Sequence, residues 1–198
     1  MSSKARGIKI GLLGLGVVGS GVARALVDRG PIIEQQLGST LDISAILVRD
    51  RDKQRHVPGL NHLLTTNPSD VIDNPEIDII VEVMGGEIPA LDFVSRAIDN
   101  RKHVVTANKE LISKEGPDLM GLAANLGVNL LFEASVGGGI PVVGPLMRDL
   151  LGNEIRSIHA IINGTTNYIL TRMAKDEMAF DKALEEAQQL GYAEADST

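Results

Sequence analysis

The 198-residue sequence contains no cysteine and no tryptophan, and only 3% of its residues are aromatic. The missing cysteines exclude disulfides, thiolate metal sites and cysteine nucleophiles. The scarcity of aromatic side chains disfavours a surface that stacks nucleic-acid bases. Lysine and arginine number 19 against 26 aspartates and glutamates, and the resulting net charge of −7 disfavours broad attraction to nucleic acid or to an anionic membrane.

Long apolar runs are missing as well. No stretch of roughly 18 or more apolar residues occurs, and residues 1–9 lack the basic region and apolar core of a signal peptide. We therefore expect a protein without a membrane partner, located in the cytoplasm. With 43% hydrophobic residues, the chain is long enough for one full domain with an ample core and part of a second one.

Short apolar strands alternate with helical patterns along the first two thirds of the chain. An apolar run at 8–13 leads into a helical pattern, which we expect to break or kink at Gly30-Pro31. A short helix is predicted from Ser69, and further strands are predicted at 43–48, 77–83, 103–106 and 128–132. This alternation predicts an α/β fold with a Rossmann-type, doubly wound parallel sheet.

The composition changes after Glu133, where a glycine-rich stretch containing proline is typical of a crossing between domains. A new strand near Glu154, a helix after it and a last helix at 180–190 predict the beginning of a second domain, of the α+β class. We therefore divide the chain at residue 134, with a first domain at 1–134 and an incomplete one at 135–198.

Gly14, Gly16 and Gly19 form a G-x-G-x-x-G pattern between the first strand and the first helix. Glycines at this spacing allow a tight turn, let backbone N–H groups approach a pyrophosphate and pack the helix against the strand. The helix N-terminus also favours anionic oxygens. The pattern therefore predicts a dinucleotide site, and a tight turn without a ligand is the alternative.

The charged residues after the second strand bear on the choice of dinucleotide. An acid at this point accepts the ribose hydroxyls of NAD, whereas an arginine pairs with the extra phosphate of NADP. Arg49 comes first and is followed by Asp50 and Arg51, an order that favours NADP. Asp50 leaves NAD open, and a solvated charged loop would also explain these residues.

Lys109 follows Asn108, a good N-cap, at the start of a predicted helix. The helix dipole opposes a cation at this end, which favours a functional role for the lysine. In a doubly wound sheet this turn lies at the ligand-binding edge, where a lysine can handle an alcohol proton or hold a carboxylate. A solvated surface lysine is the alternative.

Several polar residues further along the chain allow two interpretations each. The carboxylate of Glu133 and the carbonyls of the glycine turn after it suit a hard cation, although a carboxylate that caps the following helix is favoured by the spacing alone. Thr165 and Thr166 are either helix caps or substrate ligands. Glu194 and Asp196 either hold an ammonium group or face water.

Five motifs, taken in order, closely resemble homoserine dehydrogenase from about Ile8 to the last residue. They are GLGVVG at 14–19, TANKELIS at 106–113, EASVGGGIP at 133–141, NGTTNY at 163–168 and GYAEAD at 191–196. The resemblance implies an oxidoreductase that interconverts L-homoserine and L-aspartate 4-semialdehyde with NAD(P), in the pathway to threonine, methionine and isoleucine. It also implies a nucleotide-binding first domain, a substrate and dimerisation second domain, and a homodimer for the full-length parent.

The resemblance assigns roles to individual residues. The cofactor would be held by Gly14, Gly16, Val17, Val18, Gly19, Arg49 and Gly191, and Lys109 would be the catalytic lysine beside the nicotinamide and the substrate. Homoserine would contact Gly164, Thr165 and Glu194. A sodium ion would be bound by Glu133 and by the carbonyls of Val136, Gly138 and Ile140.

The family continues beyond the last motif into a helix that carries a substrate-binding aspartate and a proton-donating lysine. Family members also usually have Pro-Thr where this chain has Ser197-Thr198. We therefore expect a C-terminally truncated homoserine dehydrogenase with little or no activity on its own. The alternative function is a catalytically inactive NADP-binding module.

Overall fold

The computed structural model describes residues 6–53, 55, 57 and 59–193. The chain divides into two compact units, Met1–Leu150 and Leu151–Thr198. The first unit contains the whole sheet and the second contains a pair of helices.

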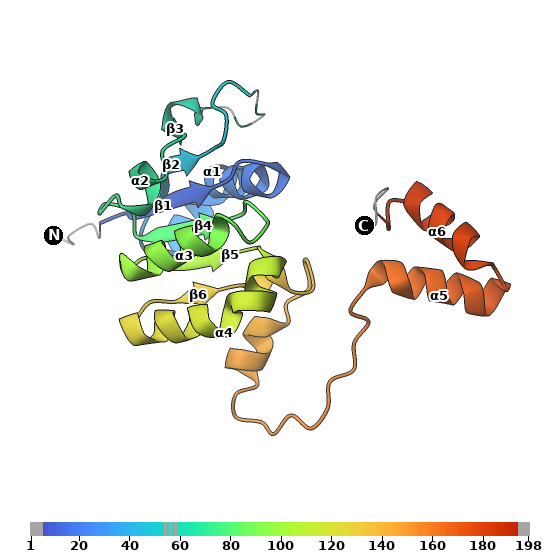
Figure 1. The fold of residues 1–198 in the computed structure, drawn as a ribbon. Helices are drawn as coiled ribbons and strands as arrows, with labels where there is room; N and C mark the ends of the chain where they lie inside the picture. The colour runs from blue at the N-terminus through green and yellow to red at the C-terminus, as the bar shows by residue number, and fades with distance from the viewer. Residues whose placement is uncertain (1–5, 54, 56, 58, 194–198) are drawn as a thin grey trace. The chain divides into compact units, whose positions relative to one another are not determined.

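The sheet of the first unit has six strands in the spatial order β3-β2-β1-β4-β5-β6 (Figure 1), and all neighbouring strands run parallel. From the central strand β1 the chain winds outward first toward β3 and then, from β4, toward β6, so the predicted doubly wound α/β sheet is confirmed. The strands are β1 (Ile8–Leu13), β2 (Leu41–Leu47), β3 (Leu64–Thr65), β4 (Ile79–Glu82), β5 (His103–Thr106) and β6 (Leu130–Leu131).

Helices connect the strands and bury both faces of the sheet. The connecting helices are α1 (Val17–Leu37), α2 (Ser69–Ile72), α3 (Ala90–Asp99) and α4 (Lys109–Leu126), with 3₁₀ turns at Asn61–Leu63 and Glu133–Ser135 and a π-helical turn at Pro145–Asp149. Ile46 packs on one face with Ala23 of α1, whereas Ile80 packs on the other with Val94 of α3 and Leu111 of α4. A sheet buried on both faces explains why its strands read as continuous apolar runs.

The structure corrects several boundaries. Helix α1 does not break at Gly30-Pro31 but continues to Leu37. Pro31 lies on the exposed side of the helix, where water can satisfy the carbonyl that proline leaves without an amide partner. The β5 strand has the predicted bounds, β2 begins two residues earlier than expected, and β4 and β6 are shorter.

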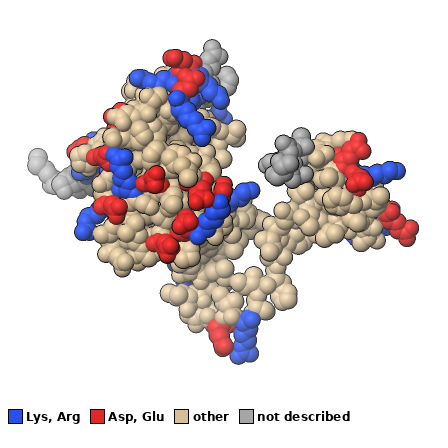
Figure 2. All heavy atoms as spheres, viewed as in Figure 1, with Lys and Arg blue, Asp and Glu red and all other residues tan. Residues whose placement is uncertain are grey.

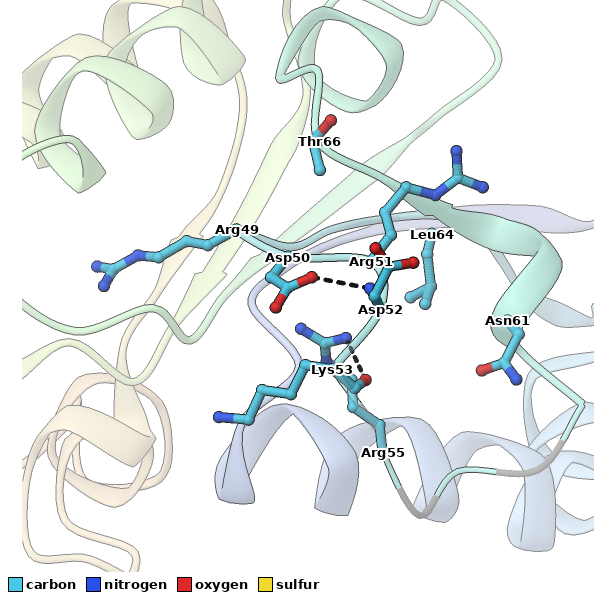
Figure 3. Close-up of a pocket in the computed structure, with 9 residues that line it drawn as sticks. All are labelled: Arg49, Asp50, Arg51, Asp52, Lys53, Arg55, Asn61, Leu64 and Thr66. Atoms are coloured by element: carbon cyan, nitrogen blue, oxygen red, sulfur yellow. Dashed lines mark hydrogen bonds between the residues drawn. The ribbon is translucent and has the colours of Figure 1, made fainter.

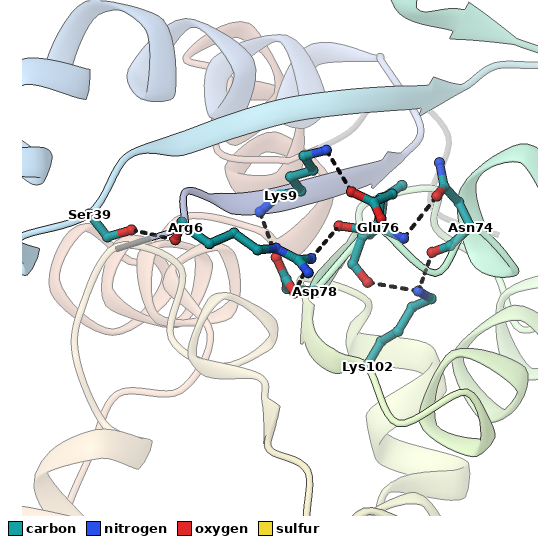
Figure 4. A network of polar contacts seen from close by, with 8 residues as sticks. Arg6, Lys9, Ser39, Asn74, Glu76, Asp78 and Lys102 are labelled. Carbon is teal, nitrogen blue, oxygen red and sulfur yellow. Dashed lines mark hydrogen bonds and ion pairs between the residues drawn. The ribbon is translucent and has the colours of Figure 1, made fainter. Parts of the chain in front are cut away.

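A polar network lies at the end of the sheet where β4 begins (Figure 4). Lys102 is almost fully buried, and its ammonium donates to the carbonyls of Asn74 and Ile77 at 2.6 and 2.7 Å. Burial lowers the pKa of Lys102, because desolvation disfavours its charged form. Nearby, Lys9 pairs with Glu76 at 3.0 Å. These polar groups at the amino ends of the strands therefore bind one another.

In the second unit, α5 (Gly164–Asp176) packs against α6 (Phe180–Gln189) around a small core of Ile169, Ala183 and Ala187. Arg172 of α5 donates two hydrogen bonds to the Glu186 carboxylate, both at 2.9 Å. The strand expected near Glu154 is wrong, because residues 154–163 have no regular secondary structure. A strand requires a partner, and the described part of this unit contains no other strand to pair with it.

Two surface properties complete the description. On the face seen in Figure 2, acidic and basic side chains are interspersed. Within the described part of the chain, no helix combines the length and the apolarity that crossing a membrane requires.

Candidate functional site

The turn between β1 and α1 requires glycine at two positions for reasons internal to the protein. Gly14 has a φ of 101°, a backbone conformation that residues other than glycine rarely adopt. A Cβ on Gly19 would lie 2.3 Å from the Gly14 carbonyl oxygen, so only glycine lets the helix start this close to the strand. The tight turn expected from the glycine pattern is thus present.

Gly16 differs from its two neighbours in the pattern. It is the N-cap residue of α1, yet a Cβ on it would meet no atom within 4 Å, so protein packing does not require glycine there. Among the described residues, no side chain caps this helix end, and its first turn contains no acid. The first helical residue, Val17, is 93% exposed. The first amides of α1 therefore have no capping side chain among the described residues, and a helix end of this kind can bind an anion.

A cleft of about 430 Å³ lies against this turn. It extends from the end of β2 across β1 to the loop after β4, where the direction of winding of the sheet reverses. Ligands of doubly wound sheets bind at this switch point. The residues that line the cleft are Gly14, Leu15, Gly16, Leu47, Val48, Arg49, Asp50, Lys53, Arg55, Thr66, Pro68, Val83, Met84, Pro89 and Phe93.

The loop after β2 forms the charged end of the cleft and also lines a second cavity of about 900 Å³ (Figure 3). The carboxylate of Asp50 accepts the N–H of Asp52 at 2.8 Å, so one of its oxygens already stabilises the turn. Arg49 is exposed and makes no hydrogen bond or ion pair with any residue in the described part of the chain. Figure 3 shows its guanidinium on the opposite side of the loop from Asn61. Arg49 is thus available for an external anion.

The turn between β5 and α4 carries Lys109. Asn108 is the N-cap of α4 as predicted, and its side-chain oxygen accepts the N–H of Leu111 at 3.1 Å. Lys109 is the first residue of the helix and is exposed, with no hydrogen-bond or ion-pair partner among the described residues. A free ammonium group therefore lies at the carboxyl edge of the sheet, at a helix end that does not stabilise it.

The sequence interpretation missed Glu82, which ends β4 and is fully buried. Its two carboxylate oxygens accept the Met84 N–H at 2.7 Å and the Thr106 hydroxyl at 2.6 Å. The available signal was a single acid inside the apolar run 79–84.

Glu133 caps the amides that precede the π-helical turn Pro145–Asp149. Its carboxylate accepts the N–H groups of Val142, Val143 and Gly144 at 2.5, 2.9 and 2.6 Å. These hydrogen bonds, led by the one from Val142, hold the pKa of Glu133 below its usual value of 4.5. The structure thus contains the helix-capping contact that was one of the two interpretations of this residue.

The three carbonyls that the resemblance groups with Glu133 for a sodium ion are not used by protein donors. Among the described residues, no donor hydrogen-bonds to the carbonyls of Val136, Gly138 or Ile140. A carboxylate offers about four acceptor positions, of which the three amides occupy three. One carboxylate position and three carbonyls are thus without a donor among the described residues, and oxygens of this kind are the ligands that hard cations prefer.

In the second unit, Gly164 and Thr165 form the first turn of α5. The side chain of Asn163 is the cap and accepts the Thr166 N–H at 2.8 Å, so the interpretation of the two threonines as caps is wrong. The Thr165 hydroxyl instead donates to the carbonyl of Tyr192. This bond brings the start of α5 to the residue after Gly191. Glu194 and Asp196 lie outside the described residues.

Comparison with known proteins agrees with this geometry. Residues 14–133 match the family model "Homoserine dehydrogenase, NAD binding domain", and residues 141–198 match the model "Homoserine dehydrogenase". The homoserine dehydrogenase of Synechocystis is 48% identical over 96% of this chain and 43% of its own length.

Solved structures give the same result. A homoserine dehydrogenase from Thiobacillus denitrificans is similar over 98% of this chain and 45% of its own, with a TM-score of 0.88 and 46% identity. A hyperthermophilic archaeal homoserine dehydrogenase in complex with NADPH has a TM-score of 0.78 and 27% identity, over 96% of this chain and 63% of its own. The chain thus spans less than half the length of the Synechocystis relative, and it belongs to the homoserine dehydrogenase family.

Proposed function

We propose that this chain forms part of an oxidoreductase that interconverts L-homoserine and L-aspartate 4-semialdehyde with NADP. The observation that carries the proposal is the uncapped N-terminus of α1 beside the cleft. Gly16 lies there, although the packing of the protein does not require glycine at this position. Membership of the family supplies the reaction. An inactive NADP-binding module is not favoured, because the relatives compared are homoserine dehydrogenases.

The residues of the cleft fit a nicotinamide dinucleotide. The pyrophosphate would bind the amides at the start of α1, at the turn formed by Gly14, Gly16, Val17, Val18 and Gly19, and Gly191 would also contact the cofactor. When bound, the nicotinamide supplies the hydride acceptor or donor of the reaction. The similar archaeal structure in complex with NADPH supports this choice of ligand.

The hydrogen bonding of Arg49 and Asp50, in the loop after β2, favours NADP over NAD. Arg49 has no partner among the described residues and can pair with a phosphate. Asp50, the residue that would accept ribose hydroxyls, already accepts an amide of its own turn.

Lys109 would act at the oxygen of the reacting carbon, where its ammonium can hold the oxyanion or transfer a proton. Gly164, Thr165 and Glu194 would hold the substrate, and Glu133 with the carbonyls of Val136, Gly138 and Ile140 would bind sodium. We also propose that the two domains divide at residue 134 and that the full-length protein is a homodimer. Its reaction would belong to the pathway to threonine, methionine and isoleucine.

The proposed substrate is tested by L-homoserine oxidation, followed as NADPH production. Because the chain spans 43% of its Synechocystis relative, the assay compares the 198 residues alone with the same residues continued by the remainder of that relative. We expect homoserine-dependent turnover in the extended chain, reduced by about 10²–10⁴ on Lys109→Met. NADP binding without homoserine-dependent turnover in the extended chain would contradict the proposed substrate, and full turnover by Lys109→Met would contradict the role of the lysine.

A further inference from the structure

Glu82 is a buried carboxylate in a strand whose other residues are apolar. It has an exposed fraction of 0% and makes no ion pair with any described residue. Burying a carboxylate is costly unless its oxygens are hydrogen-bonded, and an apolar residue would fill a parallel strand more simply. We therefore look for the role of Glu82 in the groups that its carboxylate binds.

The hydrogen bonds around Glu82 have a fixed direction. One oxygen accepts from the Met84 N–H and the other from the Thr106 hydroxyl, so both branches of the side chain must be acceptors. Only a carboxylate offers an acceptor on each branch, whereas a glutamine offers one acceptor and one donor. Because the Thr106 hydroxyl donates to Glu82, its oxygen is left to accept the Asn108 N–H at 3.0 Å.

These hydrogen bonds link two loops at the carboxyl ends of the strands. The loop after β4 is held through the Met84 amide, and the turn after β5 is held through Thr106 and Asn108. Asn108 adds a further link, because its side-chain amide donates to the Gly86 carbonyl at 2.6 Å. Lys109 is the next residue along the chain. Glu82 thus fixes both loops and the backbone position from which Lys109 extends.

The topology indicates what these loops would contact. If the adenosine half of a dinucleotide lies at the end of β2 and its pyrophosphate at the end of β1, the nicotinamide half must extend over β4 and β5. We propose that Glu82 is a positioning residue for the nicotinamide half of the cofactor: it holds the loops after β4 and β5 at the separation that the nicotinamide requires. This inference rests on the proposed dinucleotide function.

The proposal is tested by comparing two probes, NADPH and adenosine 2′,5′-bisphosphate, which contains the adenosine half without the nicotinamide. Glutamine at position 82 leaves one of the two buried donors without an acceptor. In Glu82→Gln we therefore expect the affinity for NADPH to fall about tenfold, while the affinity for the bisphosphate stays within roughly twofold of wild type. Equal losses for the two probes, or no loss for either, would overturn the proposal.

A second pair of variants decides the matter if Glu82→Gln does not fold. Thr106→Val keeps the shape of the side chain but removes the hydroxyl that links Glu82 to Asn108, so it should weaken NADPH binding selectively. Thr106→Ser keeps the hydroxyl and should restore binding. Equal NADPH affinity in the valine and serine variants would also overturn the proposal.

Glu76→Gln provides the matched control, because Glu76 lies at the opposite edge of the sheet in an exposed pair with Lys9. Both affinities should be unchanged in this variant. If the wild-type chain binds neither probe, the dinucleotide function itself fails. If it binds both and the variants do not separate them, only the role of Glu82 fails.

Discussion

Two segments of the first unit differ in what accepts hydrogen bonds from the amides at the start of a helical turn. Before Pro145–Asp149, the amides of Val142, Val143 and Gly144 all donate to the carboxylate of Glu133. At the start of α1 no side chain caps the helix and no acid lies in the first turn, although the cap residue, Gly16, lies against a cleft. One site thus contains its own anion, and the other is suited to an anion from outside.

The difference shows how one physical requirement can serve structure or function. Amides at a helix start need an acceptor, which the protein, water or a ligand can supply. The Glu133 carboxylate stabilises a turn in the chain, whereas an acid at the start of α1 would repel a pyrophosphate.

Gly19→Ala should disrupt the turn itself. The added Cβ would lie 2.3 Å from the Gly14 carbonyl oxygen, so the backbone must move. We expect a loss of about 1–3 kcal/mol in the free energy of unfolding, measured by urea denaturation, together with loss of NADPH binding. Wild-type stability and binding in this variant would show that the close approach of α1 to β1 is not required.

Arg49→Ala should weaken NADPH binding relative to NADH binding. Losing a charge-assisted pair with the extra phosphate should cost about 1–3 kcal/mol of NADPH affinity, measured by fluorescence titration with each nucleotide. Arg51→Ala is the matched control, because Arg51 lies in the same loop but does not line the cleft beside Gly16. Tighter binding of NADH than of NADPH by the wild type would instead assign the choice of cofactor to Asp50.

Glu133→Gln should destabilise the turn at Pro145–Asp149 in a pH-dependent way. The pKa of Glu133 is lowered in the folded protein, chiefly by the Val142 amide, so its stabilising effect is present above the usual value of 4.5 and is lost as the pH falls through the lowered pKa. Hydrogen exchange of the amides of Val142 and Gly144 should be faster in the variant at neutral pH, and the difference should shrink under acidic conditions. A difference that grows on acidification would contradict the capping role.

The sequence predicts the parts of the fold that depend on local patterns. The strand predicted at 103–106 is β5 with the same bounds, and Asn108 caps α4 as its position suggests. Of the break or kink expected at Gly30-Pro31, the break is wrong, because helix α1 continues to Leu37 with proline on its exposed side. The expected strand near Glu154 is wrong because pairing depends on a partner strand, which a local pattern cannot supply.

The site shows the same limit. Gly14, Gly16 and Gly19 can be recognised from spacing, because a single turn contains all three. Glu82 could not be assigned a role in this way: its partner Thr106 lies 24 residues away, and only the pairing of β4 with β5 brings the two together. Contacts between distant segments are what the structure adds to the sequence.

If the open N-terminus of α1 binds the pyrophosphate of a dinucleotide, Gly16→Val should weaken the binding of NADPH, which a fluorescence titration measures. A Cβ at position 16 would meet no protein atom within 4 Å, and the branched side chain of valine would occupy the space that an anion needs beside the amides. We expect NADPH affinity to fall at least about tenfold, while the free energy of unfolding changes by less than about 1 kcal/mol. Gly21→Val, an equally open position within α1, should leave binding unchanged. Equal NADPH affinity in the wild type and Gly16→Val would contradict the account.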